Sequence, residues 1–321
     1  MKKLLLFFLL LPVDNLQAGD LLYFEAQGIA GYSTSQHKII YHSASQHDVM
    51  QKNSLGFDYL HKFSGESGDF GTAALQARFA YNDAQHNYSP QIYNAWLKAK
   101  SQNGDFWLGH NRVAFGLASY WDTHADLLGD LTMNGISFDR DWGTGWSYDT
   151  ENGNISASLS SGTGMNYRAK GNGIAAMRIS KGVLNRDNYT TGLSVMYGNV
   201  LETMGYKIMS NKSEPVRLIG SDIAFNQDNF EHKFEIDTGT QNHNSLYAAL
   251  YRLSIKLDAE ERWKLNIQQT YVNKHKNEYL QTGSDISYLL TAYLTVRFMY
   301  QYNSQNADNL YMSQLYYYLP Y

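Results

Sequence analysis

Residues 263–271 read WKLNIQQTY, and apolar and polar side chains alternate along most of this stretch. One face carries the apolar members Trp263, Leu265, Ile267 and Tyr271. The other face carries Lys264, Asn266, Gln268 and Thr270. A repeat of two residues is the signature of a β-strand with one apolar and one polar face.

Further stretches follow the same pattern, at residues 230–237, 247–257 and 294–302. The alternation in the longer stretches persists over about 9–11 residues, the length that a tilted strand needs to cross a bilayer. A secreted soluble β-sandwich would also alternate, but its strands usually run for only about five or six residues. The pattern therefore favours membrane-spanning strands over a sandwich.

Turn signals divide the chain into short and long connections. The short ones are SGESGD from residue 64, QNGD from 102, ENGN from 151, LNRD from 184, QDN from 227, AEE from 259 and residues 291–293. Asn-Gly and Gly-Asp pairs supply the positive φ angles of tight hairpins. We expect long connections at residues 36–53, 118–138, 201–215 and 274–283. This division predicts a closed antiparallel transmembrane β-barrel of about sixteen strands, with short periplasmic turns and longer external loops.

Composition excludes several other classes of protein. The 321 residues include 26 Tyr and 6 Trp but only 4 Pro, which suits long strands with aromatic girdles. A formal charge of −4 argues against a nucleic-acid partner, and the absence of Cys excludes disulfides and thiolate metal sites. Beyond residue 18, no apolar run is long enough for a membrane-spanning helix.

The first eighteen residues, MKKLLLFFLLLPVDNLQA, have the pattern of a secretory signal peptide. Two lysines precede an apolar run of about ten residues, and Ala18 suits the cleavage position. An uncleaved anchor helix is the alternative, but this run is too short to span a bilayer. We expect a signal peptide at residues 1–18 and one barrel domain at 19–321.

The chain ends YMSQLYYYLPY, with Leu315, Tyr317, Leu319 and Tyr321 on one face. This ending resembles the last strand of Gram-negative outer-membrane barrels, although Tyr321 replaces the usual Phe and Pro320 precedes it. With the signal peptide and the strands, the chain resembles a porin. The resemblance implies the cell outer membrane as location, and the lipid bilayer, lipopolysaccharide and the barrel-assembly machinery as partners. It leaves a homo-oligomer possible.

In a membrane barrel the polar face of each strand lines the lumen, because a Lys or Arg facing the lipid midplane costs about 2–4 kcal/mol. With the apolar residues of each strand assigned to the lipid face, among them Tyr93, Trp107, Val113 and Phe115, alternation turns the basic residues of the strands inward. These residues are Arg78, Lys98, Arg112, Arg178, Arg252, Lys256 and Arg297. An inward charge therefore indicates a polar lumen, and it does not by itself indicate charge selectivity.

The segment after the predicted fifth strand is the third external loop, and it reads LASYWDTHADLLGDLTMNG from residue 117. In porins this loop commonly folds inward, so the resemblance implies that residues 118–134 narrow the lumen. Asp122, Asp126 and Asp130 follow at intervals of four, which would place them on one side of a helical turn. Arg78, Lys98 and Arg112 would face them, and such opposed charges filter permeants by sign. An exposed loop with solvated carboxylates is the alternative.

These features predict a passive diffusion channel for small hydrophilic solutes or ions, which needs no cofactor. A structural barrel that sheathes a partner, such as a cytochrome or a secretion component, is the second hypothesis, and a barrel enzyme is the third. The sequence contains no P-loop, HExxH or GxSxG motif, so we expect no enzyme. His37, His42 and His47 in the first loop are more easily explained as solvated than as metal ligands.

Overall fold

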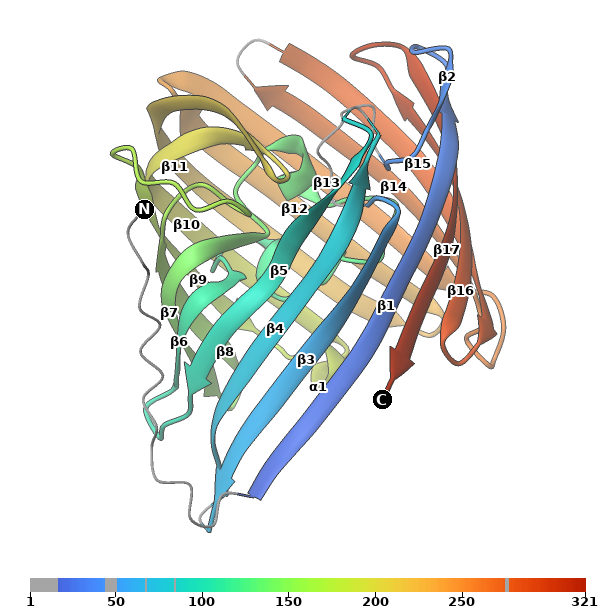
Figure 1. The fold of residues 1–321 in the computed structure, drawn as a ribbon. Coiled ribbons are helices and arrows are strands. Elements are labelled where there is room, and N and C mark those ends of the chain that lie inside the picture. Colours follow the sequence, from blue (N-terminus) through green and yellow to red (C-terminus); the bar gives the residue numbers. More distant parts are fainter. Residues whose placement is uncertain (1–16, 44–50, 67, 84, 275–276) are drawn as a thin grey trace.

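In the described part of the chain, sixteen long strands form one closed sheet, and a short strand pairs with the end of the first one (Figure 1). The computed structural model describes residues 17–43, 51–66, 68–83, 85–274 and 277–321. Its strands are β1 (Gln17–Ser33), β2 (Lys38–Ile40), β3 (Ser54–Gly65), β4 (Gly68–Asn82), β5 (Asn87–Ala99), β6 (Asp105–Arg112), β7 (Arg140–Thr150), β8 (Gly153–Ser160), β9 (Gly173–Lys181), β10 (Tyr189–Met204), β11 (Lys207–Gln227), β12 (Phe230–Gln241), β13 (Asn244–Lys256), β14 (Trp263–Lys274), β15 (Asn277–Thr291), β16 (Leu294–Asn303) and β17 (Asp308–Pro320). The described helices are single turns: η1 (Leu117–Ser119), η2 (Leu131–Asn134) and α1 (Leu184–Asp187).

The barrel closes between its first and last strands, which lie side by side in Figure 1. Strand β1 pairs with β3 on one edge and with β17 on the other, so that Tyr23 is opposite both Asp58 and Pro320. All the pairings in the sheet are antiparallel, and each long strand after β3 pairs with the next one in sequence. The predicted closed antiparallel barrel of about sixteen strands is confirmed.

The two ends of the barrel differ in their connections. At the end where β1 begins and β17 finishes, which we call the turn end, the predicted short turns all occur. At the opposite loop end, long connections cover residues 34–53, 113–139 and 161–172. The long loops expected at 201–215 and 274–283 are wrong. Strands β10 and β11 continue to Met204 and from Lys207, and β14 and β15 continue to Lys274 and from Asn277. Polar segments that show no alternation still pair there through their backbones.

Alternation along the strands separates an outer and an inner face. On β10 the outward Leu193 and Tyr197 are 66% and 64% exposed, whereas the inward Ser194 is buried. Near the turn end the inward side chains are polar, as in β13, where Arg252 faces the lumen. Near the loop end the inward side chains of the same strand are apolar instead: Leu246, Ala248 and Leu250 are buried. The barrel therefore has an apolar inner wall in addition to its apolar outer surface.

Most of the expected signal peptide lies outside the described residues, and only its last two positions, Gln17 and Ala18, form the start of β1. The signal peptide stays a prediction. Within the residues described, no helix is long and apolar enough to cross a membrane.

Candidate functional site: the inner loop of the barrel

The segment that connects β6 to β7, residues 113–139, turns into the barrel, and we call it the inner loop. It enters the lumen at Gly116, whose φ of 59° and ψ of −160° lie in a region that only glycine adopts readily. The amide of Gly116 donates to Ser194 Oγ (3.0 Å), and the amide of Leu117 donates to Glu235 Oε1 (3.1 Å). Glycine is also required sterically, because a Cβ at position 116 would meet the Glu235 carboxylate. Polar groups of β10 and β12 therefore hold the loop where it enters the lumen.

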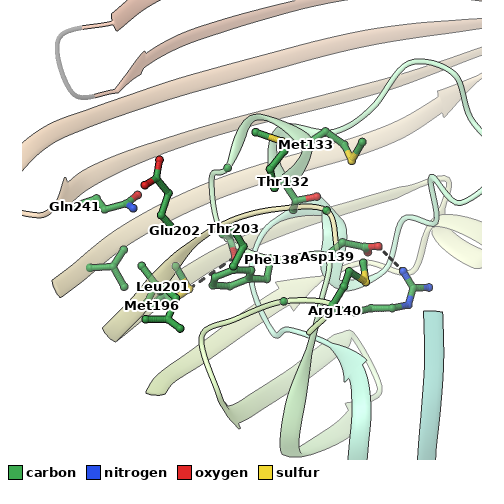
Figure 2. Close-up of a pocket in the computed structure, with 18 of the residues that line it drawn as sticks. Thr132, Met133, Phe138, Asp139, Arg140, Met196, Leu201, Glu202, Thr203 and Gln241 are labelled. Carbon is green, nitrogen blue, oxygen red and sulfur yellow. Dashed lines mark hydrogen bonds and ion pairs between the residues drawn. The ribbon is translucent and has the colours of Figure 1, made fainter. Parts of the chain in front are cut away.

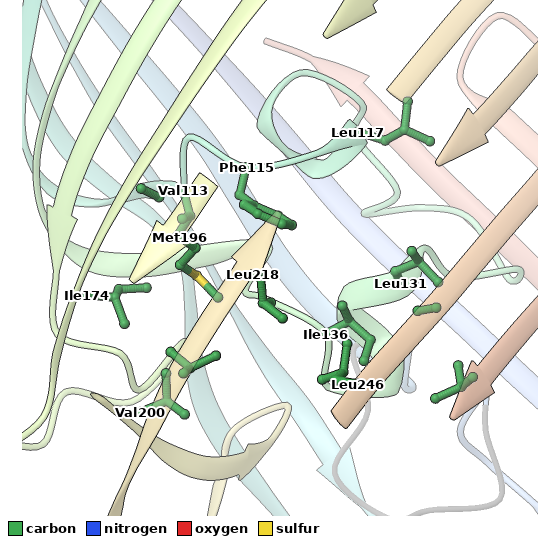
Figure 3. Close-up of a cluster of buried hydrophobic side chains, with 14 of the residues drawn as sticks. Val113, Phe115, Leu117, Leu131, Ile136, Ile174, Met196, Val200, Leu218 and Leu246 are labelled. Atoms are coloured by element: carbon green, nitrogen blue, oxygen red, sulfur yellow. The ribbon is translucent and has the colours of Figure 1, made fainter. Parts of the chain in front are cut away.

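Apolar packing holds one side of the inner loop against the barrel wall (Figure 3). Phe115, Leu131 and Ile136 from the loop region are buried in one cluster with inward residues near the loop end. The wall residues of this cluster are Ile174, Ala176, Met196, Val200, Val216, Leu218, Leu246, Ala248, Leu250 and Val272. Removing these apolar side chains from water stabilises the loop position by about 25 cal/mol for each Å² buried. The apolar inner wall is therefore the surface on which the loop rests.

The other side of the inner loop packs against a different wall. Leu127 and Leu128 are buried in a second cluster. The remaining members of that cluster are Ile29, Ile40, Met299, Leu310 and Met312, from β1, β2, β16 and β17. Beside it, His124 Nε2 lies 2.9 Å from both carboxylate oxygens of Glu25 on β1. The inner loop thus contacts opposite sides of the barrel.

Two of the three loop aspartates form ion pairs with arginines of the wall. Asp122 Oδ2 lies 2.8 Å from Arg112 Nη2 and 3.4 Å from Arg140 Nη2. Asp126 Oδ2 lies 2.8 Å from Arg252 Nη1. Burial opposes the ionisation of Asp122, but the guanidinium groups of Arg140 and Arg112 outweigh it and hold the pKa of this carboxyl well below its usual range. The opposed charges therefore touch instead of facing each other across a gap.

The third aspartate has a structural position. Asp130 is fully buried, and its side chain accepts from the Thr132 amide (3.0 Å), so that it caps η2. Burial raises the pKa of Asp130 to about 6, and the nearby charge of Asp139 adds to the rise. The expected helical alignment of the three aspartates is wrong, because residues 120–130 form no helix.

Two aromatic residues of the inner loop stack on wall arginines. The Arg178 guanidinium lies 4.7 Å from the ring centre of Tyr120, and that of Arg252 lies 4.3 Å from the ring of Trp121. Arg178 also makes two hydrogen bonds to Asp222 on β11, of 2.7 and 3.0 Å. Cations held over aromatic faces attract the ring electrostatically, so these contacts add to the ion pairs.

The other predicted basic residues lie elsewhere on the inner face. Arg78 is buried and donates to Gln91 Oε1 (3.0 Å), Lys98 lies 3.8 Å from Asp105, and Arg297 donates to Gln314. Lys256 pairs with Glu261 (2.6 Å) in the turn after β13. Of the trio expected to face the loop aspartates, Arg112 is the member that contacts one in the described structure. The geometry brings Arg112, Asp122, Asp126, Arg178 and Arg252 to the inner loop.

Four residues assigned to the lipid face are instead buried inside the barrel: Tyr93, Trp107, Val113 and Phe115. Tyr93 is the extra residue of a bulge in β5, opposite Gln76 and Ala77, and a bulge re-aims a side chain. Val113 and Phe115 follow the end of β6 and pack on the apolar inner wall. The assignment failed because it equated apolar with outward.

Sequence reasoning missed Arg140, which is the most deeply placed cation of the site. It pairs with Asp139 (2.5 Å) and Asp122, donates to Asn94 Oδ1 (2.7 Å) and stacks over the Tyr93 ring at 3.7 Å. Its only signal was its place in the FDRDWG stretch that closes the inner loop. Glu25 and His124, which pair with each other, were also missed.

Among the cavities of the described structure, one lies on the turn-end side of the inner loop and another on its loop-end side, and these two share no lining residue. The turn-end cavity has a volume of about 620 Å³ and is lined by Lys98, Arg112, Tyr120, Trp121, Asp122, Arg178 and Lys233, among others. The loop-end cavity has a volume of about 80 Å³ and contains Met133, Phe138, Met196 and Leu201 (Figure 2). The tip of the β10–β11 hairpin closes over it. The Tyr206 hydroxyl donates to the Ile92 carbonyl of β5 (3.2 Å), and the Asn166 amide donates to the Tyr206 carbonyl.

The first-loop histidines do not gather in the described part of the chain. His42 is buried and pairs with Asp83 (2.9 Å), and His37 lies in the turn before β2, whereas His47 falls outside the described residues. Among the described residues, no group of three or more His, Asp or Glu could hold a metal ion.

No protein-family model matches this sequence, and no curated protein matches it. Solved structures match the fold. An anion-selective porin from Comamonas acidovorans superposes with a TM-score of 0.66 at 9% identity, over 95% of this chain and 100% of that one. The trimer form of OmpT, an outer membrane protein of Vibrio cholerae, gives 0.65 at 9% identity over 95% and 100%. The outer membrane channel DcaP of Acinetobacter baumannii gives 0.60 at 12% identity over 95% and 97%. The chain has the fold of the Gram-negative outer-membrane porins.

Proposed function

We propose that this chain is a passive channel for small hydrophilic solutes in the cell outer membrane, driven by the concentration gradient of the solute. The observation that carries the proposal is the clamped inner loop. Its carboxylates are paired with Arg112, Arg140 and Arg252 on different strands, and its apolar residues rest on two walls. A loop held from several sides fixes the width of the lumen, which is what a size filter requires.

The lining of the narrow region suits hydrophilic solutes. Ion pairs and amide side chains surround the inner loop on the turn-end side, where the cavity of about 620 Å³ has room for a small molecule. Rings of charge at close quarters select permeants by size and sign. Because both signs are paired here, we expect weak charge selectivity and a strong limit on size.

The proposal includes its surroundings. The barrel contacts lipid through its apolar outer face and lipopolysaccharide near its loop end, and its last strand is recognised by the barrel-assembly machinery. A homo-oligomer is compatible with this fold. A barrel that sheathes a cytochrome or secretion component would need a clear lumen, and the buried contacts of Phe115, Leu117 and Leu128 with the walls oppose that second function.

The experiment is single-channel recording of the purified chain in planar bilayers, together with swelling of proteoliposomes in solutes of increasing size. We expect a small, steady conductance and permeation by small solutes only. A matched variant, Tyr206→Phe, removes the hydroxyl contact of the β10–β11 hairpin and should conduct at least as well. If neither protein conducts or admits a solute, the channel proposal fails.

A further inference from the structure

Three tyrosine rings form a ladder on the lumen wall of β1 and β17. Tyr23 and Tyr318 stack at 4.6 Å between ring centres with a 12° angle, and Tyr318 and Tyr316 follow at 6.2 Å and 12°. The ladder faces the lumen, because Tyr23 shares a face of β1 with Glu25, which binds His124 of the inner loop. All three tyrosines are partly exposed. A permeant that enters from the turn end therefore meets this ladder before it meets the inner loop.

A carboxylate lies beside the ladder. Asp58 on β3 is the register partner of Tyr23, and it accepts a hydrogen bond from the Tyr318 hydroxyl (2.9 Å). Among the residues that the structure describes, no Lys, Arg or His forms an ion pair with Asp58. It differs in this from Asp122, Asp126 and Asp222, each of which contacts an arginine. Asp58 is thus a lumen anion next to aromatic faces, and it lacks a counterion within the described chain.

Aromatic faces and a carboxylate together suit one kind of ligand. The face of a tyrosine ring is electronegative and attracts a cation, above all a weakly hydrated alkylammonium. The ladder already holds such a charge at its inner end, where the Arg297 guanidinium lies 5.5 Å from the Tyr316 ring centre. An anion would be repelled by Asp58, and a neutral solute would leave that charge uncompensated.

We propose that Tyr23, Tyr316, Tyr318 and Asp58 form a binding site for organic ammonium ions on the turn-end side of the inner loop. The site deepens the proposed function by naming a class of solute, and it rests on that function only for the route by which the solute arrives. Small cations that carry methyl or methylene groups fit best, because they bury apolar surface on the rings while their charge faces Asp58.

The test is calorimetric titration of the full chain in a non-ionic detergent with choline. Dimethylbutanol, in which carbon replaces the charged nitrogen, is the uncharged comparison, and potassium chloride at equal ionic strength shows what a simple inorganic cation does. We expect saturable binding of choline, much weaker binding of dimethylbutanol and little competition by potassium. Asp58→Asn and Tyr23→Leu should each weaken choline binding roughly fivefold or more, because each removes one source of attraction for the cation.

Two matched variants separate the site from general effects. Asp20→Asn makes the same charge change on the outer face near the turn end, where Asp20 contacts Tyr59 and His61, and should leave choline binding unchanged. Tyr318→Phe keeps the ring and removes the hydroxyl bonded to Asp58, and should change binding less than Tyr23→Leu does. Heat-modifiable migration on gels checks that each barrel is folded.

The outcomes are distinct. Equal binding of choline and dimethylbutanol, unchanged binding in a folded Asp58→Asn barrel, or no binding to the unsubstituted chain would each overturn the site. Because binding is measured in detergent, it does not depend on conduction. A barrel that conducts but does not bind choline would contradict the binding site and leave the proposed channel standing. A barrel that binds choline but does not conduct would contradict the proposed channel and leave the binding site standing.

Discussion

Asp126 of the inner loop and Arg252 of β13 form an ion pair of 2.8 Å, and the same guanidinium donates to the Leu128 carbonyl and to Gln268 Oε1. Arg252 is buried and also lies over the Trp121 ring. One wall residue thus binds a carboxylate, a carbonyl and an aromatic face of the loop. The charges of the inner loop and of the wall at the narrow region therefore neutralise each other through direct ion pairs.

Removing the carboxylates of the inner loop should change the charge selectivity of the channel. In the double variant Asp122→Asn and Asp126→Asn, Arg112 and Arg252 lose their carboxylate partners and Arg140 keeps only Asp139, while side-chain size hardly changes. We expect anion permeability to rise relative to cation permeability, most at low salt where screening is weak. Reversal potentials across a salt gradient measure the change. Asp130→Asn is the control, since Asp130 is buried; a double variant with an unaltered reversal potential would contradict the assignment.

Asp130 should give the inner loop a pH-dependent stability. Its pKa is about 6 in the folded chain against 3.8 as its ordinary value, so the folded state binds the proton more tightly. The free energy of unfolding therefore falls as the pH rises from about 4 to about 6, and this contribution stays constant above that range. Asn still caps η2 but does not titrate. The midpoint of thermal unfolding, measured from pH 4 to 7, should lose this component in Asp130→Asn; parallel curves for both proteins would refute it.

Gly116→Ala should loosen the inner loop. The new methyl group would meet the Glu235 carboxylate, and the φ of 59° with ψ of −160° is strained for any other residue, by about 1–3 kcal/mol. We expect faster proteolysis and faster amide exchange in residues 113–139. Gly28→Ala is the control, because a Cβ there meets nothing within 4 Å. Adding Glu235→Ala should restore part of the protection by removing the collision but not the backbone strain.

Tyr206→Phe should weaken the cover at the loop end. The substitution removes the hydrogen bond to the Ile92 carbonyl, which joins the β10–β11 hairpin to β5. We expect a higher open probability or more frequent opening in single-channel records. Tyr167→Phe, at a residue 67% exposed in the β8–β9 connection, should have no such effect. Identical records for all three proteins would mean that the hairpin does not limit conduction.

Labelling tests the orientation of the barrel. The chain has no Cys, so single cysteines can be placed freely. Asn306→Cys lies at the loop end between β16 and β17, and Asn152→Cys lies at the turn end between β7 and β8. A bulky maleimide polymer should modify the first on intact cells and the second only after permeabilisation. The reverse pattern would invert the topology.

The strands could be predicted where one face meets lipid and the other meets water. Residues 247–257 and 263–271 alternate for this reason, and both lie within β13 and β14 or reach one residue beyond them. The predicted long loops at 201–215 and 274–283 failed because strands above the bilayer need no alternation. Their backbones pair regardless of which side chains they carry.

The candidate site was predictable only in part. The acidic loop and its inward direction came from a likeness to porins, and Asp122 and Asp126 do contact wall arginines. Asp130 differs because a local bond to Thr132, invisible in the spacing, turns it into a cap. Phe115 was assigned to lipid because hydropathy alone cannot separate an apolar wall inside a barrel from one outside. Arg140 was missed because nothing in its neighbourhood distinguishes it from a solvated charge.

The apolar inner wall has a consequence for how the barrel is assembled. In the loop-end half of β13, Leu246, Ala248 and Leu250 face inward while Tyr247, Ala249 and Tyr251 face outward, so both faces suit an apolar environment. A slip of one residue exchanges the two sets and costs little there. The same slip turns Arg252 toward lipid, at a cost of about 2–4 kcal/mol near the midplane. Arg252, which holds the inner loop in the folded barrel, therefore also keeps β13 in register while the strands pair during assembly.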